Sequence, residues 1–136
     1  MTAQKGKDLL VKIGDGAGGF TAVAGLRTRQ LALNAEAVDV TSADSTGRWR
    51  ELLEGAGVRR AAISGAGVFR DAASDALMRQ VFFEGSIRTY QVVIPDFGVI
   101  EGPFQVAGLE YRGDHAGEVT FDLAFESAGA LTFTAL

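Results

Sequence analysis

The sequence contains no cysteine, so neither a disulfide nor a thiolate metal site can stabilise it. His115 is the single histidine, which excludes a metal site built on two histidines. No apolar run approaches the roughly 20 residues that span a bilayer. The first residues also lack the apolar stretch of a secretion signal. We therefore expect a protein that folds in the cytoplasm, binds no metal and does not insert into a membrane.

Proline is scarce and glycine is abundant, with 2 prolines against 18 glycines in 136 residues. Frequent glycines favour tight turns and β-bulges, which predicts a strand-rich fold with short connections. The length suits one domain covering residues 1–136. A net charge of −4 argues against tight nucleic-acid binding, because that binding needs clustered Lys and Arg to displace phosphate counterions.

Alternation of apolar and polar residues predicts most of the chain to be strands. We expect strands at 8–13, at 20–34 (a pair or one bent strand, interrupted at Gly25), and at 58–69, 86–94, 99–112, 117–127 and 130–134. One helix is expected at about 71–84, with Asp71 as its N-cap and Gly85 just beyond its end. The predicted fold class is mainly β, an antiparallel β-sandwich or barrel with one flanking α-helix and a long loop at about 35–57.

The strand at 117–127 has two different faces. Its apolar face consists of Val119, Phe121, Leu123 and Phe125, and its polar face includes Glu118, Asp122 and Glu126. The apolar face is expected in the core and the acidic face at the surface.

One glycine motif invites a functional interpretation. Gly14, Gly16 and Gly19 fit the dinucleotide-binding pattern G-x-G-x-x-G, and Asp39 lies about where a ribose-binding acid would be. That site needs a helix starting at the glycines, whereas the following FTAVAG alternates like a strand. We therefore predict a plain turn here, no cofactor and, since no catalytic constellation converges elsewhere, no enzyme.

The polar stretch VDVTSADSTGRWRELLEG, residues 38–55, is the most distinctive segment. Turn-forming residues precede the only tryptophan, and arginines flank it. Trp49 could cover its own sheet or contact another subunit, and Arg48 and Arg50 favour the contact, because Arg and Trp are enriched at interaction hot spots. The predicted interface residues are Val38, Asp39, Thr41, Ser42, Arg48, Trp49, Arg50, Leu52 and Leu53.

The same segment resembles the "VDVTS…W…LL.G" stretch of major tail tube proteins of long-tailed bacteriophages and gene transfer agents. ISGAGVF with the helix after it, and GPFQVAGLEYRGDHAGEVTFDLAFESAG near the end, are similar to later parts of that family's pattern. The resemblance implies hexameric rings of this chain, stacked into a hollow tube in a virion or gene-transfer-agent tail. It also implies neighbours in the tail, namely tail terminator, tape-measure and distal tail proteins, and DNA that passes through without specific binding.

A face bearing Glu118, Asp122 and Glu126 would repel phosphates if it lined the bore, so we expect these residues in the lumen. The sequence alone leaves open that this face lies outside. A small monomeric ligand-binding β-barrel is the alternative function, and it predicts an apolar cavity inside the sheet.

Overall fold

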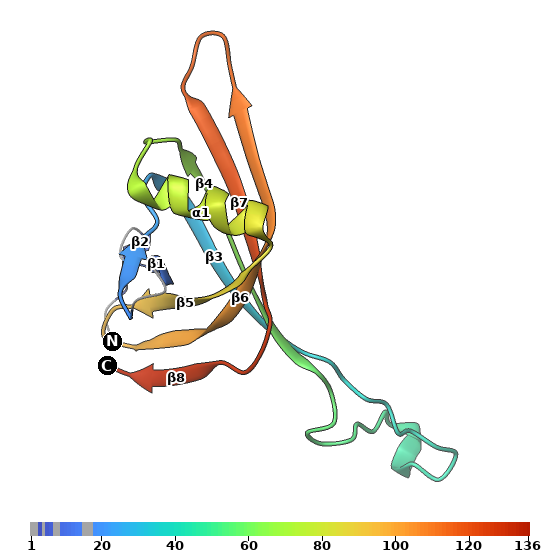
Figure 1. Ribbon diagram of the computed structural model, residues 1–136. Coiled ribbons are helices and arrows are strands. Elements are labelled where there is room, and N and C mark those ends of the chain that lie inside the picture. Colours follow the sequence, from blue (N-terminus) through green and yellow to red (C-terminus); the bar gives the residue numbers. More distant parts are fainter. Residues whose placement is uncertain (1–2, 4, 7–8, 15–17) are drawn as a thin grey trace.

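The computed structural model describes residues 3, 5–6, 9–14 and 18–136. In this part of the chain the backbone forms eight strands, one α-helix and a short 3-10 helix, η2 (Figure 1). The elements are β1 (Leu10–Gly14), β2 (Phe20–Ala22), β3 (Leu26–Ala35), η2 (Thr46–Arg48), β4 (Arg59–Val68), α1 (Ala73–Glu84), β5 (Ile87–Ile94), β6 (Gly98–Gly113), β7 (Val119–Ser127) and β8 (Thr132–Ala135). The predicted fold class, mainly β with one helix, is confirmed.

All eight strands belong to one antiparallel sheet in the order β2-β1-β5-β6-β7-β4-β3, with β8 beside β6. The two outer strands, β2 and β3, are not paired with each other in the described residues, so the sheet is open rather than a closed barrel. The predicted segment at 20–34 is therefore two strands, β2 and β3, which lie at opposite ends of the sheet order.

Strand β6 is shared by two parts of the sheet. Its first half pairs with β5 and β8, and its second half pairs with β7. A β-bulge between Val106 and Gly108 interrupts the ladder with β7, and bulges bend and twist strands. We call β2, β1, β5, β8 and the first half of β6 the β5 half-sheet, and the rest of β6 with β7, β4 and β3 the β7 half-sheet.

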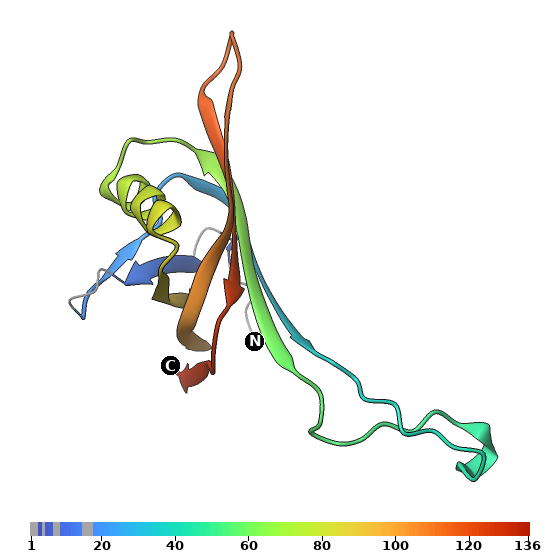
Figure 2. The same cartoon turned by 45° about the vertical axis from the view of Figure 1, so that its right-hand side comes forward.

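The core lies between the two half-sheets and is closed by α1 (Figure 2). Tyr90 of β5 and Phe125 of β7 are fully buried, and their ring centroids are 4.6 Å apart. Phe104 of β6 packs edge-on against Tyr90, and Met78 and Val81 of α1 belong to the same cluster. The predicted inward face of β7 is confirmed for three of its four residues, since Phe121, Leu123 and Phe125 are buried and Val119 at the strand's start is exposed.

The start of α1 differs from the prediction. The N-cap is Ala72 and not Asp71, which has a φ of 51° outside the helix. Asp75, in the first turn, accepts a hydrogen bond from the Ala72 amide at 3.0 Å. The free amides at a helix start can be satisfied by the side chain of the N-cap residue or by a carboxylate three residues later. In α1 only the carboxylate, that of Asp75, does so.

The end of α1 agrees with the prediction. Gly85 is left-handed, with a φ of 67°. Its amide donates to the Phe82 carbonyl at 3.1 Å, and the Ser86 amide donates to the Val81 carbonyl at 3.3 Å. This pair of bonds is the Schellman arrangement, in which glycine is favoured because it adopts positive φ without strain.

The hydroxyl of Tyr90 is the basis of a first prediction. It is buried and has no hydrogen-bond partner among the described residues. Leaving a polar group without a partner in the core costs about 1–3 kcal/mol. Tyr90→Phe removes that group and keeps the ring, so we expect a free energy of unfolding about 1 kcal/mol higher at pH 7, measured by urea denaturation.

The same substitution has an expected effect at high pH. Burial raises the pKa of Tyr90 to about 12, whereas an unfolded tyrosine titrates near 10. Between these values the unfolded state releases a proton that the folded state retains, so the free energy of unfolding falls as pH rises. The fall from pH 10 to 12 should be smaller in Tyr90→Phe than in the wild type. Equal pH dependence in both proteins would contradict the assignment.

Candidate functional site: the projecting arm and the outer sheet face

The chain between β3 and β4 forms a long arm that projects away from the sheet (Figures 1 and 2). Its two sides continue the hairpin as an irregular ladder. The Glu36 amide donates to the Val58 carbonyl at 2.8 Å, and the Leu53 amide donates to the Val38 carbonyl at 2.9 Å. We call residues 36–58 the arm, which is one residue later at each end than the predicted loop at 35–57.

Local hydrogen bonds hold the middle of the arm. An Asx-type turn joins the Asp39 carboxylate to the Thr41 amide at 2.8 Å, and the Thr41 hydroxyl accepts from the Glu51 amide at 2.7 Å. Hydrogen bonds from Thr41, and the nearby charge of Arg50, lower the pKa of Asp39. Asp39 pairs with Leu52 in an isolated antiparallel bridge. The arm is therefore an ordered hairpin-like extension.

The tip turns at η2, where Gly47 and Arg48 both have positive φ. Trp49 follows, and 78% of its surface is exposed; Leu52 and Leu53 are also exposed. The interpretation that Trp49 covers its own sheet is therefore wrong. Exposed aromatic and aliphatic side chains at the end of an arm are typical of a surface that another molecule covers.

All nine predicted interface residues lie on this arm, and the structure brings them together. Val38, Asp39, Leu52 and Leu53 form its middle, Thr41 and Ser42 approach the tip, and Arg48, Trp49 and Arg50 follow the turn. Their roles in subunit contact remain a prediction.

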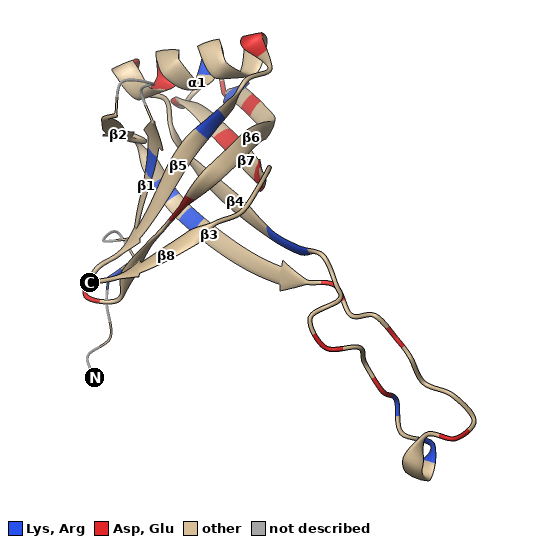
Figure 3. Ribbon diagram, turned by 60° about the horizontal axis from the view of Figure 1, so that its bottom comes forward, with Lys and Arg blue, Asp and Glu red and all other residues tan. Residues whose placement is uncertain are grey.

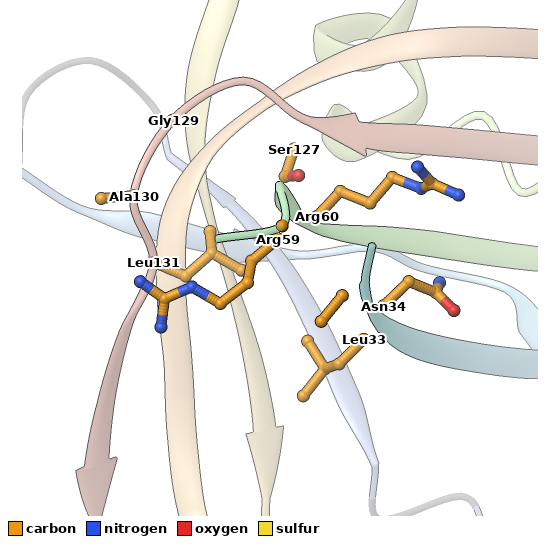
Figure 4. A pocket seen from close by; sticks show the side chains of 10 residues that line it. Leu33, Asn34, Arg59, Arg60, Ser127, Gly129, Ala130 and Leu131 are labelled. Carbon is orange, nitrogen blue, oxygen red and sulfur yellow. The ribbon is translucent and has the colours of Figure 1, made fainter. Parts of the chain in front are cut away.

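A groove at the base of the arm was not predicted from the sequence. It has a volume of about 600 Å³ (Figure 4). Its apolar lining includes Leu33 and Leu131, and its charged lining consists of Arg59 and Arg60, with no carboxylate among the lining residues. The groove joins β3 and β4 to the segment between β7 and β8, which lies far along the chain, so no local pattern could indicate it.

The strands of the β7 half-sheet carry charged residues of both signs (Figure 3), and we call the face of these strands opposite the core its outer face. Asp122 and Glu126 lie on this face of β7, opposite its buried residues, and Glu118 lies just before the strand. Two of these acids are ion-paired: Asp122 with Arg112 at 2.9 Å and Glu118 with Arg27 at 3.1 Å. The sequence pattern indicated the acids but not their arginine partners, which come from other strands.

The glycine motif does not precede a helix. Gly14 ends β1, Gly16 lies outside the described residues, and the chain continues into β2. Asp39 is on the arm, away from this turn. In the described residues the chain after the motif continues as β2, which disagrees with the helix start that the dinucleotide pattern needs.

Two further observations concern the described residues. These residues contain no cluster of three His, Asp or Glu side chains that could hold a metal ion. Their helix is also too short and too polar to cross a membrane.

Comparison with known families identifies the architecture. The sequence model of the phage tail tube protein family matches residues 3–133. No curated protein matches the chain.

Solved structures give the same result. A protein in the tail of an empty gene transfer agent particle, with C6 symmetry, is 57% identical, with a TM-score of 0.95 over 98% of this chain and 100% of that one. A protein in the virion of a native gene transfer agent particle is 56% identical, with a TM-score of 0.92 over 98% of this chain and 100% of that one. The tail tube protein of SPP1 shares the fold, at 13% identity and a TM-score of 0.74 over 97% of this chain and 79% of that one. The chain belongs to the phage tail tube protein family.

Proposed function

We propose that this protein is the tube-forming subunit of a gene-transfer-agent-type tail. Copies close into rings of six, and the rings stack into a hollow conduit for DNA. The observation that carries the proposal is 57% identity, over 98% of the chain, to a protein in a tail of C6 symmetry. The role is structural and needs no catalytic group.

The open sheet supports ring formation. β2 and β3 each have one side without a strand partner in the described part of the sheet, and such edges pair readily with another chain. Joining two different edges of neighbouring copies makes a heterologous contact, which closes into a ring when the rotation between copies fits. The top and bottom of such a ring remain free for stacking.

The arm supports contact beyond one copy. Its ladder gives it a fixed direction, while its tip contributes nothing to the core of its own chain. Covering the exposed side chains of Trp49, Leu52 and Leu53 in another subunit would stabilise the assembly by the hydrophobic effect, at about 25 cal/mol per Å² of apolar area.

The outer face of the β7 half-sheet fits a bore. Asp122 and Glu126 are on it, and Arg112 and Arg60 are placed on it by the strand registers, so charges of both signs are interspersed. A bore that lacks a strong positive charge does not retain the DNA backbone. In this proposal the tail terminator, tape-measure and distal tail proteins are the remaining neighbours, and DNA binds nowhere along the wall.

The first test concerns the arm. Trp49→Ala should leave the free energy of unfolding within about 0.5 kcal/mol of wild type, because the side chain is exposed. The same substitution should raise the concentration needed for tube assembly at least tenfold, since central interface aromatics are worth about 2 kcal/mol or more. Urea denaturation measures the first quantity, and negative-stain microscopy across a concentration series measures the second.

Phe83→Ala is the matched control, because Phe83 is an aromatic of similar exposure (80%) on α1. If both variants impair assembly equally, the arm has no special role. If concentrated wild-type protein remains a single folded species with no rings or tubes, the proposed function itself is wrong.

The second test concerns the bore. Asp122→Lys combined with Glu126→Lys should slow or prevent DNA transfer by assembled particles, because the new cations attract phosphates. Glu101→Lys is the control, since Glu101 lies on the outer face of the other half-sheet, where it accepts a hydrogen bond from Gln91. Transfer that is unchanged in the double variant, with particles assembled normally, would place this face outside the bore.

A further inference from the structure

A hollow of about 330 Å³ lies between α1 and the β6–β7 hairpin, away from the arm. Its lining residues come from three parts of the chain: Phe69, Asp71, Asp75, Ala76, Arg79, Tyr111 and Val119. The tail tube function proposed above does not by itself assign this hollow a role.

The hollow combines exposed aromatic surface with negative charge. Phe69 and Tyr111 pack edge to face, with ring centroids 5.9 Å apart, yet 37% and 45% of their surfaces are exposed. Asp71 is exposed and has no ion pair among the described residues. Asp75 is buried, and one of its carboxylate oxygens has no hydrogen-bond partner in the described structure. Aromatic faces beside carboxylates are suited to a guanidinium group or an indole ring.

The tip of the arm has the complementary chemistry. Trp49 is exposed, and Arg48 beside it has no ion pair in the part of the chain that the structure describes. Arg50 lies close enough to Asp39 to lower the pKa of that carboxylate, so Arg48 is the cation that the tip offers most freely. The hollow, in contrast, offers two anions, Asp71 and Asp75, and one cation, Arg79.

The two features lie at opposite ends of one strand. β4 leaves the arm at Arg59 and ends at Val68, immediately before Phe69 of the hollow. The arm and the α1 end of the sheet point away from each other in Figure 1, so the tip cannot reach the hollow of its own chain. Complementary surfaces at opposite ends of a subunit form a heterologous contact that repeats without limit along an axis.

We propose that the hollow between α1 and the β6–β7 hairpin receives the arm tip of a second copy of this chain, in the next ring of the stack. Arg48 lies against Asp71, and Trp49 packs on the exposed surfaces of Phe69 and Tyr111. The inference rests on the proposed tube function and adds the receiving site. The arm-base groove of Figure 4 is the less suitable receptor, because its Arg59 and Arg60 would repel Arg48.

Cross-linking provides a direct test, because the chain has no cysteine of its own. Ala43→Cys places a thiol near the arm tip, Ala76→Cys places one in the hollow, and Ala130→Cys places one in the arm-base groove. All three alanines are exposed. Tubes of the Ala43→Cys, Ala76→Cys double variant, treated with a short bis-maleimide, should give a ladder of covalent multimers in a denaturing gel. Tubes of the Ala43→Cys, Ala130→Cys double variant should not.

The outcomes separate the two proposals. A ladder seen only with the Ala43→Cys, Ala130→Cys double variant would show that the arm tip binds the arm-base groove of a neighbour. That result would overturn the inference, while the presence of tubes would still support the proposed function. Normal tubes that give no ladder with either pair would also overturn the inference. Wild-type protein that forms no tubes would overturn the proposed function first.

A double-mutant cycle tests the charge pair. Arg48→Asn and Asp71→Asn remove each charge, and Asn tolerates the positive φ of both positions. Each single variant should raise the concentration needed for stacking several-fold, and the double variant should be no worse than either single variant. Effects that multiply in the double variant would show that the two side chains do not meet.

Discussion

The structure depends on β6 serving two half-sheets at once. A single strand of ordinary length could pair with β5 or β7 but could not give each of them a full ladder, so β6 runs for 16 residues. The bulge at Val106 and Gly108 bends the strand between the part that pairs with β5 and the part that pairs with β7. Because of that turn, Tyr90 and Phe125, from different half-sheets, face each other in one core with α1 closing it.

The arm, unlike β6, contributes no residue to the core cluster. β3 and β4 pair along their length, and the chain between them continues outward beyond the other strands and the α-helix of the described structure. Its order comes from hydrogen bonds such as those of Thr41 with Asp39 and Glu51, which need no apolar packing. The apolar side chains near the tip, Trp49, Leu52 and Leu53, are exposed and add little apolar burial to the folded subunit. In the proposed tube, folding of the subunit and assembly would therefore depend on separate residues.

Most elements followed from local pattern, and the features that did not follow depend on distant residues. Alternation predicts β7 and its buried Phe121, Leu123 and Phe125, because a strand's two faces are encoded in consecutive residues. Gly85 predicts the end of α1 for a similarly local reason. The strand order, the pairing of Asp122 with Arg112 and the two surface hollows involve segments far apart in the sequence, which one chain's periodicity does not specify. The prediction of Asp71 as the N-cap of α1 was wrong by one residue. Asp71 and Asp75 both suit a helix start, and only the backbone conformation distinguishes them.

A subunit that builds a tube needs one contact that closes a ring and a second contact that repeats from ring to ring along the tube axis. Sheet edges can provide the first, because lateral pairing rotates each copy relative to the last until the ring is complete. The stacking contact must join two different faces of the ring. A self-complementary face would pair two rings and leave no matching face for a third. β4 separates the arm from the α1 end of the sheet by its full length, so the two ends of this subunit differ in shape, in charge and in aromatic exposure. In the proposed tube, that difference would give the stack a direction, as a conduit between two different tail ends requires.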